Sequence, residues 1–190
     1  MTRIFCRVFF LFSAFTARSS HAAALTLDSI RQHYRNISEF HGEAEQTKTS
    51  PLLLRPLKSK VQLSLEKEVL TWQPEGQEPW RMRFSADGKP VFINGGKTLA
   101  QLPSSARDKL DRTVTLVRNI LTMDPKLDDD FHLKLDQGHL TIEPKSVKVD
   151  VFFKAIDLTF KPNADLLSIN FKTADDETTL LFKTMTITRL

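Results

Sequence analysis

Four of the five histidines lie beyond the first 24 residues and are the side chains most able to bind a metal or move a proton: His33, His41, His132 and His139. Polar and apolar residues alternate on both sides of Gln137-Gly138, which predicts a hairpin. In its register His132 faces Glu143 and His139 faces Asp136, so neither histidine approaches the other. We therefore predict four surface histidines and no metal site.

The remaining polar clusters do not form a catalytic pattern. Glu43 and Glu45 share one face of a predicted strand, which is typical of a solvated face, although paired carboxylates can also do acid–base chemistry. The run Asp128–Asp130 lacks the alternating ligands of a calcium loop, and Asn94–Lys97 lacks the strand-loop-helix context of a phosphate loop. We predict a protein that is not an enzyme and has no cofactor.

The first 24 residues have the features of a secretory signal peptide. Arg3 and Arg7 precede an apolar run over Val8–Phe15, and small residues end the segment at Ala22–Ala24. The run is too short to cross a bilayer, although an uncleaved anchor is the alternative. We predict a signal peptide over residues 1–24 and a single domain over residues 25–190. The only cysteine, Cys6, is removed with the signal, so the mature chain has no thiol.

The signal segment also accounts for most of the net charge. The whole chain has 27 basic and 23 acidic side chains and a formal charge of +4. Three of the basic side chains and none of the acidic ones precede Leu25, so the mature chain is close to neutral. Its charge therefore gives no reason to expect a nucleic acid partner.

Two helices are predicted from capping residues and apolar spacing. Thr26 can cap a helix through Ile37. A capping pattern at Ser105–Asp108 begins a second helix, which Asp124-Pro125 ends after Met123. Its apolar stripe is broad enough to lie across an apolar surface rather than in solvent: Leu110, Val114, Val117 and Leu121, widened by Leu116 and Ile120.

A period of two predicts strands over most of the remaining chain. Short alternating runs cover 61–65, 70–72, 80–84, 131–135 and 140–142, and Glu177–Arg189 is a further strand. A hairpin turning at Pro162–Asp165 places Ile156, Leu158 and Phe160 opposite Leu167, Ile169 and Phe171. Leu181, between Leu180 and Phe182, points to the other face and needs a cover. The fold class is α+β: about eight antiparallel strands in a strongly curved sheet with helices on one side.

The order of these motifs resembles the LolA family of periplasmic lipoprotein carriers. The resemblance rests on the strand Phe40–Gln46, on Leu70-Thr71-Trp72, on the turn Ser85–Gly88, and on the strand order after Phe131. It extends over nearly all of Leu25–Ile187. It implies an incomplete, strongly curved antiparallel β-barrel with a helical lid over a hydrophobic cavity that holds acyl chains, and a location in the periplasm.

Two features differ from the family pattern. Typical carriers have an Arg-Pro pair shortly before the tryptophan, whose arginine helps to hold the lid; here Glu66-Lys67 occupies that place. The sequence also ends at Leu190, where typical carriers continue. We expect Glu66 to face solvent, the lid to be held mainly by apolar contacts, and the cargo to have diverged.

The predicted function is carriage of acyl chains of lipoproteins, or of other lipids, toward the outer membrane. The partners would be an acylated lipoprotein or lipid cargo, with membrane-bound donor and acceptor proteins. The alternative is a periplasmic interaction or sensor module that recognises a lipid or peptide. Each candidate cavity residue could equally be ordinary core: Leu63, Leu65, Leu70, Trp72, Met82, Phe84, Val114, Val117, Leu121, Phe152, Phe153, Phe160 and Phe171.

Overall fold

A computed structural model describes residues 24–85, 89–93, 104–146 and 152–190; the predicted signal peptide lies almost wholly outside them, as does the Asn94–Lys97 turn. The strands are β1 (Ile37–Thr49), β2 (Leu57–Glu66), β3 (Val69–Pro74), β4 (Trp80–Phe84), β5 (Pro90–Phe92), β6 (Phe131–Asp136), β7 (His139–Pro144), β8 (Ala155–Phe160), β9 (Leu166–Lys172) and β10 (Glu177–Arg189). The helices are α1 (Leu27–Tyr34), α3 (Ser104–Thr122) and α4 (Leu127–Asp130).

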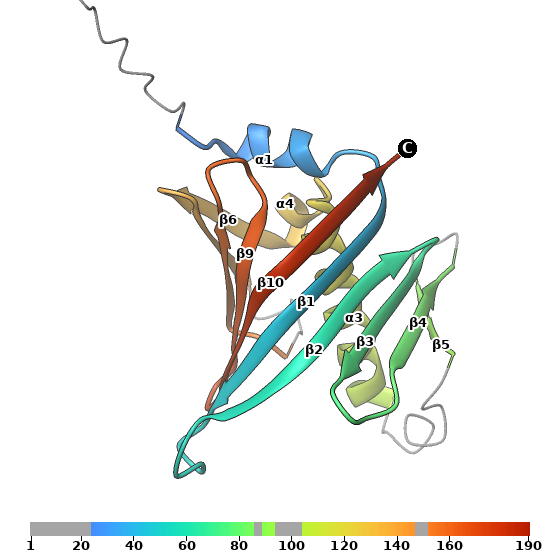
Figure 1. Cartoon of the computed structure of the whole chain (residues 1–190), viewed down its shortest axis with the longest axis vertical. Coiled ribbons are helices and arrows are strands. Elements are labelled where there is room, and N and C mark those ends of the chain that lie inside the picture. The colour runs from blue at the N-terminus through green and yellow to red at the C-terminus, as the bar shows by residue number, and fades with distance from the viewer. Residues whose placement is uncertain (1–23, 86–88, 94–103, 147–151) are drawn as a thin grey trace, which may run out of the picture.

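All ten strands form one antiparallel sheet in the order β5-β4-β3-β2-β1-β10-β9-β8-β7-β6. Strands β5 and β6 are its two edges, so the sheet is an open, curved surface rather than a closed barrel. The described helices lie on one side of it (Figure 1). This architecture confirms the predicted fold class. It has more strands than predicted; β5 is too short for an alternation to be visible in the sequence.

Helix α1 begins where the sequence predicts and ends earlier. The Thr26 hydroxyl accepts a hydrogen bond from the Ser29 amide, and the Ser29 hydroxyl accepts one from the Thr26 amide. The prediction of a helix through Ile37 is wrong at its C-terminal end. Asn36 has a positive φ of 58°, which turns the chain and starts β1 at Ile37.

The hairpin of β6 and β7 has the predicted register. Leu135 pairs with Leu140 and Leu133 with Ile142. Gln137 and Gly138 have φ values of 46° and 82°, the left-handed pair that a two-residue turn of this type requires. A Cβ at Gly138 would also lie 3.3 Å from the carbonyl oxygen of Phe160, so this position favours glycine on two grounds.

Three sequence predictions are corrected in the second half of the chain. A register shift after Thr159 pairs Phe160 with Leu166, so Leu166 is buried and the predicted inward residue Leu167 is not. Leu181 is covered only in part; it is 37% exposed. The acidic run Asp128–Asp130 forms most of α4 rather than a turn, and Asp128 pairs with Arg31 of α1 at 2.7 Å.

The core divides into two parts. We call the closed core the region where β1 and β7–β10 pack against α1, α4 and the C-terminal half of α3. We call the cavity region the space between β3–β5 and the segment Leu110–Val117 of α3. The largest side chains that are fully buried include none from β3, β4 or β5: Tyr34, Phe40, Ile30, Leu63, Leu121, Leu127, Leu140, Ile142, Ile156, Leu158, Ile169 and Leu180.

Candidate binding cavity under helix α3

The cavity region contains a cavity of about 340 Å³. Its floor comes from β3, β4, β5 and the turn between β3 and β4, and its roof comes from α3. The lining residues are Leu70, Trp72, Pro74, Gln77, Trp80, Met82 and Phe92 from the floor, and Leu110, Thr113, Val114 and Val117 from the roof. Its volume falls within the range of about 300–1,000 Å³ that is usual for ligand sites.

Strand register brings the floor residues together. Leu70 pairs with Met82, Trp72 with Trp80, and Met82 in turn with Phe92. Side chains of directly paired residues lie on the same face of a sheet, so these pairs form one continuous apolar surface. The alternation in the sequence therefore determines the floor, because every second residue of β3 and β4 must point toward α3.

Helical spacing supplies the roof. Leu110, Val114 and Val117 are four and three residues apart, which places them on one stripe of α3 facing the sheet. Further along the helix, Ile120 and Leu121 continue the stripe into the closed core, where both are buried. One helix thus roofs the cavity along Leu110–Val117 and packs tightly at its C-terminal end.

The cavity opens toward solvent at the turn between β3 and β4. Trp80 has its side chain on the same face as Met82 and lines the cavity, yet the residue is 51% exposed. Pro74 and Gln77 lie beside it in the same lining. An aromatic ring at the mouth gives apolar contact to a ligand that is only partly inside.

The interior of the cavity has no unsatisfied polar group among the lining residues. Thr113 is the single buried polar residue of the described chain. Its hydroxyl donates to the carbonyl of Lys109 at 2.8 Å and accepts from the amide of Phe152 at 3.2 Å. Since those bonds are internal, the interior offers a ligand dispersion contacts and removal of apolar surface from water rather than polar recognition.

Helix α3 is fastened to the sheet beside the cavity by Arg118. Its guanidinium pairs with the carboxylate of Glu68 at 2.7 Å and lies 5.0 Å from the ring centre of Phe84. Glu68 is in the turn between β2 and β3 with a φ of 66°, a strained value for a residue with a side chain. We expected a lid held mainly by apolar contacts, and this ion pair is an additional charged contact. Its arginine, Arg118, belongs to the helix and its acid, Glu68, belongs to the sheet side.

Glu66 faces solvent, as expected. It lies at the end of β2 on the outer face, and its carboxylate is 3.6 Å from the imidazole of His41. Leu63 and Leu65, by contrast, are buried on the inner face. Alternation along β2 therefore separates the acid from the cavity.

Five of the thirteen candidate residues line the cavity: Leu70, Trp72, Met82, Val114 and Val117. Others are buried but lie in the hydrophobic core outside the lining: Leu63, Leu65, Phe84, Leu121, Phe160 and Phe171. Phe153 packs against Phe171 with ring centres 4.8 Å apart, and Phe152 is largely exposed with the ammonium of Lys109 near its ring. The lining residues absent from the candidates are Pro74, Gln77, Trp80, Phe92, Leu110 and Thr113. Of these, Trp80 shares the alternation of Met82 and Leu110 shares the stripe of Val114, so both had a signal in the sequence.

The histidines lie apart from the cavity. His132 pairs with Glu143 and His139 with Asp136 in the predicted register, and His33 contacts Asp165 at 3.1 Å. Within the described ranges, no three histidine, cysteine or acidic side chains are grouped so that they could hold a metal ion. In the same ranges, no helix has the length and apolar character needed to span a membrane.

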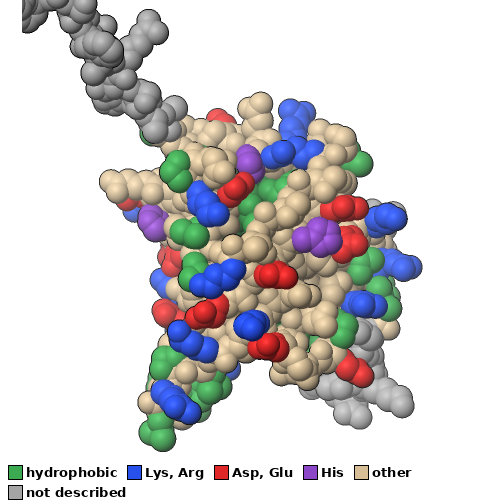
Figure 2. Space-filling view, in the orientation of Figure 1, with side chains coloured by type: hydrophobic (Ala, Val, Ile, Leu, Met, Phe, Trp, Pro, Cys, Tyr) green, Lys and Arg blue, Asp and Glu red, His purple; other side chains and the backbone are tan. Residues whose placement is uncertain are grey.

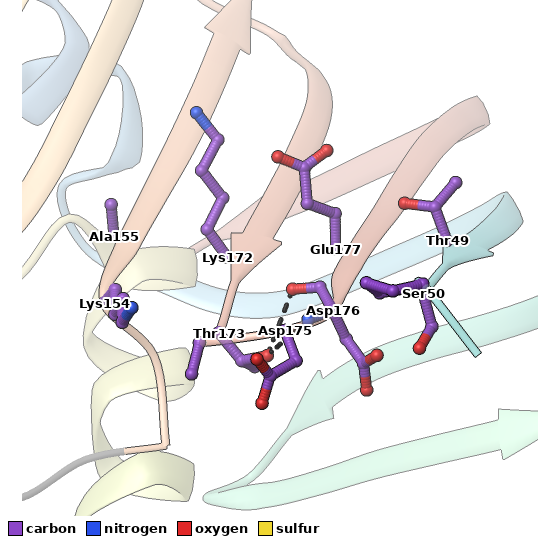
Figure 3. Close-up of a pocket in the computed structure, with 11 residues that line it drawn as sticks. Thr49, Ser50, Lys154, Ala155, Lys172, Thr173, Asp175, Asp176 and Glu177 are labelled. Carbon is purple, nitrogen blue, oxygen red and sulfur yellow. Dashed lines mark hydrogen bonds between the residues drawn. The ribbon is translucent and has the colours of Figure 1, made fainter.

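A second depression, of about 500 Å³, lies where β1 and β9 end and β10 begins, and its lining is charged (Figure 3). Thr173 and Asp176 close the turn between β9 and β10: the Thr173 hydroxyl donates to the Asp176 carbonyl at 3.1 Å and accepts from its amide at 3.0 Å. A hydrogen bond from Ser50, together with Lys48, lowers the pKa of the Asp176 carboxyl. These contacts join the end of β1 to the start of β10.

Comparison with known proteins gives matches at the level of structure. No protein-family model matches the sequence, and no curated protein matches it. A MucA/MucB complex from Pseudomonas aeruginosa matches 85% of this chain at 14% identity and a TM-score of 0.42; this chain covers only 55% of that one. A LolA superfamily protein from Nitrosomonas europaea matches 88% of this chain and 96% of its own length, at 11% identity and a TM-score of 0.34. A putative outer membrane lipoprotein-sorting protein domain from Vibrio parahaemolyticus matches 85% of this chain and 90% of its own length, at 8% identity and a TM-score of 0.35. The matched structures thus include the superfamily that the sequence resembles.

Proposed function

We propose that the protein binds the acyl chain of a lipid or lipoprotein in the cavity under α3 and carries it through the periplasm toward the outer membrane. The observation that supports the proposal is the cavity itself, with an apolar lining and a mouth at Trp80. Signal-dependent export, membrane-bound donor and acceptor partners and the absence of catalysis belong to the same proposal, and they rest on the sequence.

An acyl chain suits this cavity for two physical reasons. The lining is dominated by aliphatic and aromatic side chains, so transfer of methylene groups from water into it is favourable. The mouth is open and carries Gln77, so the polar end of an acylated cargo stays in water while the chain enters. A fully polar ligand would lose its hydration without finding partners inside.

Tryptophan fluorescence gives a direct test, because the only two tryptophans of the chain, Trp72 and Trp80, both line the cavity. A brominated fatty acid should quench their emission saturably, and the unbrominated fatty acid should compete. Quenching that rises linearly with concentration, without saturation, would contradict binding in the cavity.

A matched pair of variants locates the binding. Val117→Asn places a polar amide in the roof and should weaken binding of the brominated fatty acid about tenfold. Arg112→Asn introduces the same side chain at an exposed position of α3 and should leave binding unchanged. If both variants remain folded and bind equally well, the site is not under α3.

The competing interpretation is a module that recognises a peptide. The molecule that remains bound to the purified protein distinguishes such a module from a lipid carrier. Mass spectrometry of organic extracts from gently purified protein should show a stoichiometric lipid. A co-purifying polypeptide with no lipid, together with quenching that does not saturate with fatty-acid concentration, would favour the interaction module.

A further inference from the structure

The hairpin connecting β1 and β2 extends beyond the rest of the sheet and ends in exposed leucines. In Figure 2 this projection, at the lower left, is covered by hydrophobic and basic side chains. Leu52 is 94% exposed and Leu54 is fully exposed at 108%, and Leu57 at the start of β2 is also exposed. We call residues 50–57 the leucine tip. Exposed leucines this close together are unusual on a surface that faces only water.

The leucine tip has a defined conformation. The amide of Leu53 donates to the Ser50 carbonyl at 3.0 Å, and the amide of Leu52 donates to the Ser50 hydroxyl at 3.3 Å. Pro51 and Pro56 restrict the backbone on either side of the leucines. The leucines therefore have a defined arrangement before binding, so binding a surface costs less conformational entropy than it would for a disordered loop.

The charged side chains of the leucine tip and of the strand ends beside it are basic, and acids of neighbouring segments lie next to the strand ends. Residues 48–60 contain Lys48, Arg55, Lys58 and Lys60 and no acidic residue. The three lysines pair with Asp176, Glu45 and Glu75 at 3.1–3.5 Å, and the side chains of Lys58 and Lys60 remain largely exposed. Arg55, between the leucines, forms no ion pair with any described residue. Leucines flanked by basic groups match the interface of an anionic bilayer, where acyl chains lie beneath phosphates.

The leucine tip lies at the same end of the sheet as the mouth of the cavity. The turn between β3 and β4, which carries Gln77 and Trp80, is joined to the base of the tip by the amide of Glu75, which donates to the Lys60 carbonyl at 2.9 Å. Figure 1 shows both turns directed toward one end of the molecule. A surface that binds the tip is therefore near the opening under α3.

We propose that the leucine tip docks the protein on an anionic lipid bilayer, with Leu52 and Leu54 in the interface and Arg55 at the phosphates. The cavity mouth then faces the membrane from which an acyl chain enters or into which it leaves. A second copy of the chain is a poorer occupant, because pairing two tips brings together two Arg55 guanidinium groups that form no ion pair with any described residue. The docking goes beyond the proposed cargo binding and does not depend on it.

Co-sedimentation with vesicles tests the proposal. The full mature protein should bind vesicles of phosphatidylglycerol mixed with phosphatidylcholine, bind phosphatidylcholine alone much more weakly, and lose binding as salt rises. Leu52→Ser/Leu54→Ser should weaken binding about tenfold, and Arg55→Glu at least about fivefold. Equal binding by the parent and the double variant would overturn the proposal.

Leu190→Ser is the matched control. Leu190 is 96% exposed but lies at the opposite end of the central strands, where its amide donates to the Asn36 carbonyl, so its replacement should not change vesicle binding. Fatty-acid quenching of Trp72 and Trp80 in solution should be unaffected by the tip variants, which separates a failure of docking from a failure of cargo binding. A tip that binds no vesicles and forms dimers through the same leucines would assign the surface to a second copy and overturn the proposal.

Discussion

The closed core and the cavity region share a sheet and a covering helix, and they differ in what fills the concave face. Over β7–β10, the side chains of α1, α4 and the end of α3 occupy the space, and Leu140, Leu158 and Ile169 are completely buried. Over β3–β5, α3 is the only described helix that meets the sheet, through Leu110, Val114 and Val117, and a cavity remains. The same inward alternation of apolar residues therefore forms a filled core where several helices supply side chains. It leaves a cavity where a single described helix supplies them.

The largest expected difference is in the cost of removing a leucine. Leu158→Ala, in the closed core, should lower the free energy of unfolding by about 3–4 kcal/mol because the neighbours cannot collapse into the space. Leu70→Ala, in the cavity lining, should cost about 2 kcal/mol because one side of Leu70 already faces the cavity. Urea unfolding midpoints and slopes measure both. Equal losses would show that the two regions are packed alike.

Adding atoms should also cost more stability in the closed core than in the cavity region. A Cβ at Gly42 would lie 2.5 Å from a ring carbon of Phe182, so Gly42→Ala should destabilise by about 2 kcal/mol. Val117→Leu adds a methylene group to the cavity and should change stability by less than about 0.5 kcal/mol while weakening fatty-acid binding. Phe182→Leu should recover part of the Gly42→Ala loss. An additive double variant would mean that the ring contact is not the cause.

Alkaline pH should lower the free energy of unfolding because Tyr34 is buried in the closed core. Burial raises the pKa of the Tyr34 phenol well above its ordinary value of 10.0, and its oxygen accepts the Leu166 amide at 2.9 Å. Above pH 10 the unfolded chain loses this proton while the folded chain keeps it. The unfolding free energy should then fall by up to about 1.4 kcal/mol per pH unit, and this stability is fully present below pH 10.

Tyr34 is the only tyrosine, so its ionisation can be followed by ultraviolet difference absorbance and compared with unfolding. Tyr34→Phe should be less stable at neutral pH and should lose this part of the alkaline dependence. Free titration of Tyr34 in the folded protein near pH 10 would contradict the burial argument.

The smallest effect is expected at the ion pair that fastens α3. The Glu68 carboxylate is largely exposed, so Glu68→Gln should cost only about 0.5 kcal/mol. Glu68→Gly also removes the pair but relieves the positive φ, so it should be the more stable of the two variants. Dissociation of a bound fatty acid should be faster in both. If dissociation is unchanged, Arg118 stabilises the fold without controlling the opening.

Sequence patterns predicted which face of the sheet a side chain occupies, but they did not predict whether that side chain lies in the core or lines the cavity. Alternation correctly placed Leu70, Trp72 and Phe171 on the inner face, but Phe171 is in the hydrophobic core outside the lining while Trp72 lines the cavity. The difference depends on where helices end over the sheet, which no local pattern records. Trp80 shows the same limit, since it shares the alternation of Met82 and is 51% exposed while Met82 is buried.

Contacts between distant segments could not be predicted. Arg118 and Glu68 are 50 residues apart, and neither position has a local feature that indicates the other. The hairpin of β6 and β7 could be predicted to the residue because its register depends only on a two-residue turn and the alternation on either side.

The position of β1 beside β10 has a consequence for the order of folding. Strands β1–β5 pair only with sequence neighbours, as do β6–β10, and a single pairing joins the two groups. That pairing closes a long loop: the Arg189 guanidinium donates to the His33 carbonyl, 156 residues earlier. Until β10 has emerged, the long strand β1 keeps one edge free and each half-sheet keeps its apolar face uncovered. A chain that crosses a membrane from its N-terminus must therefore remain in this state throughout translocation, when pairing with another chain competes with its own completion.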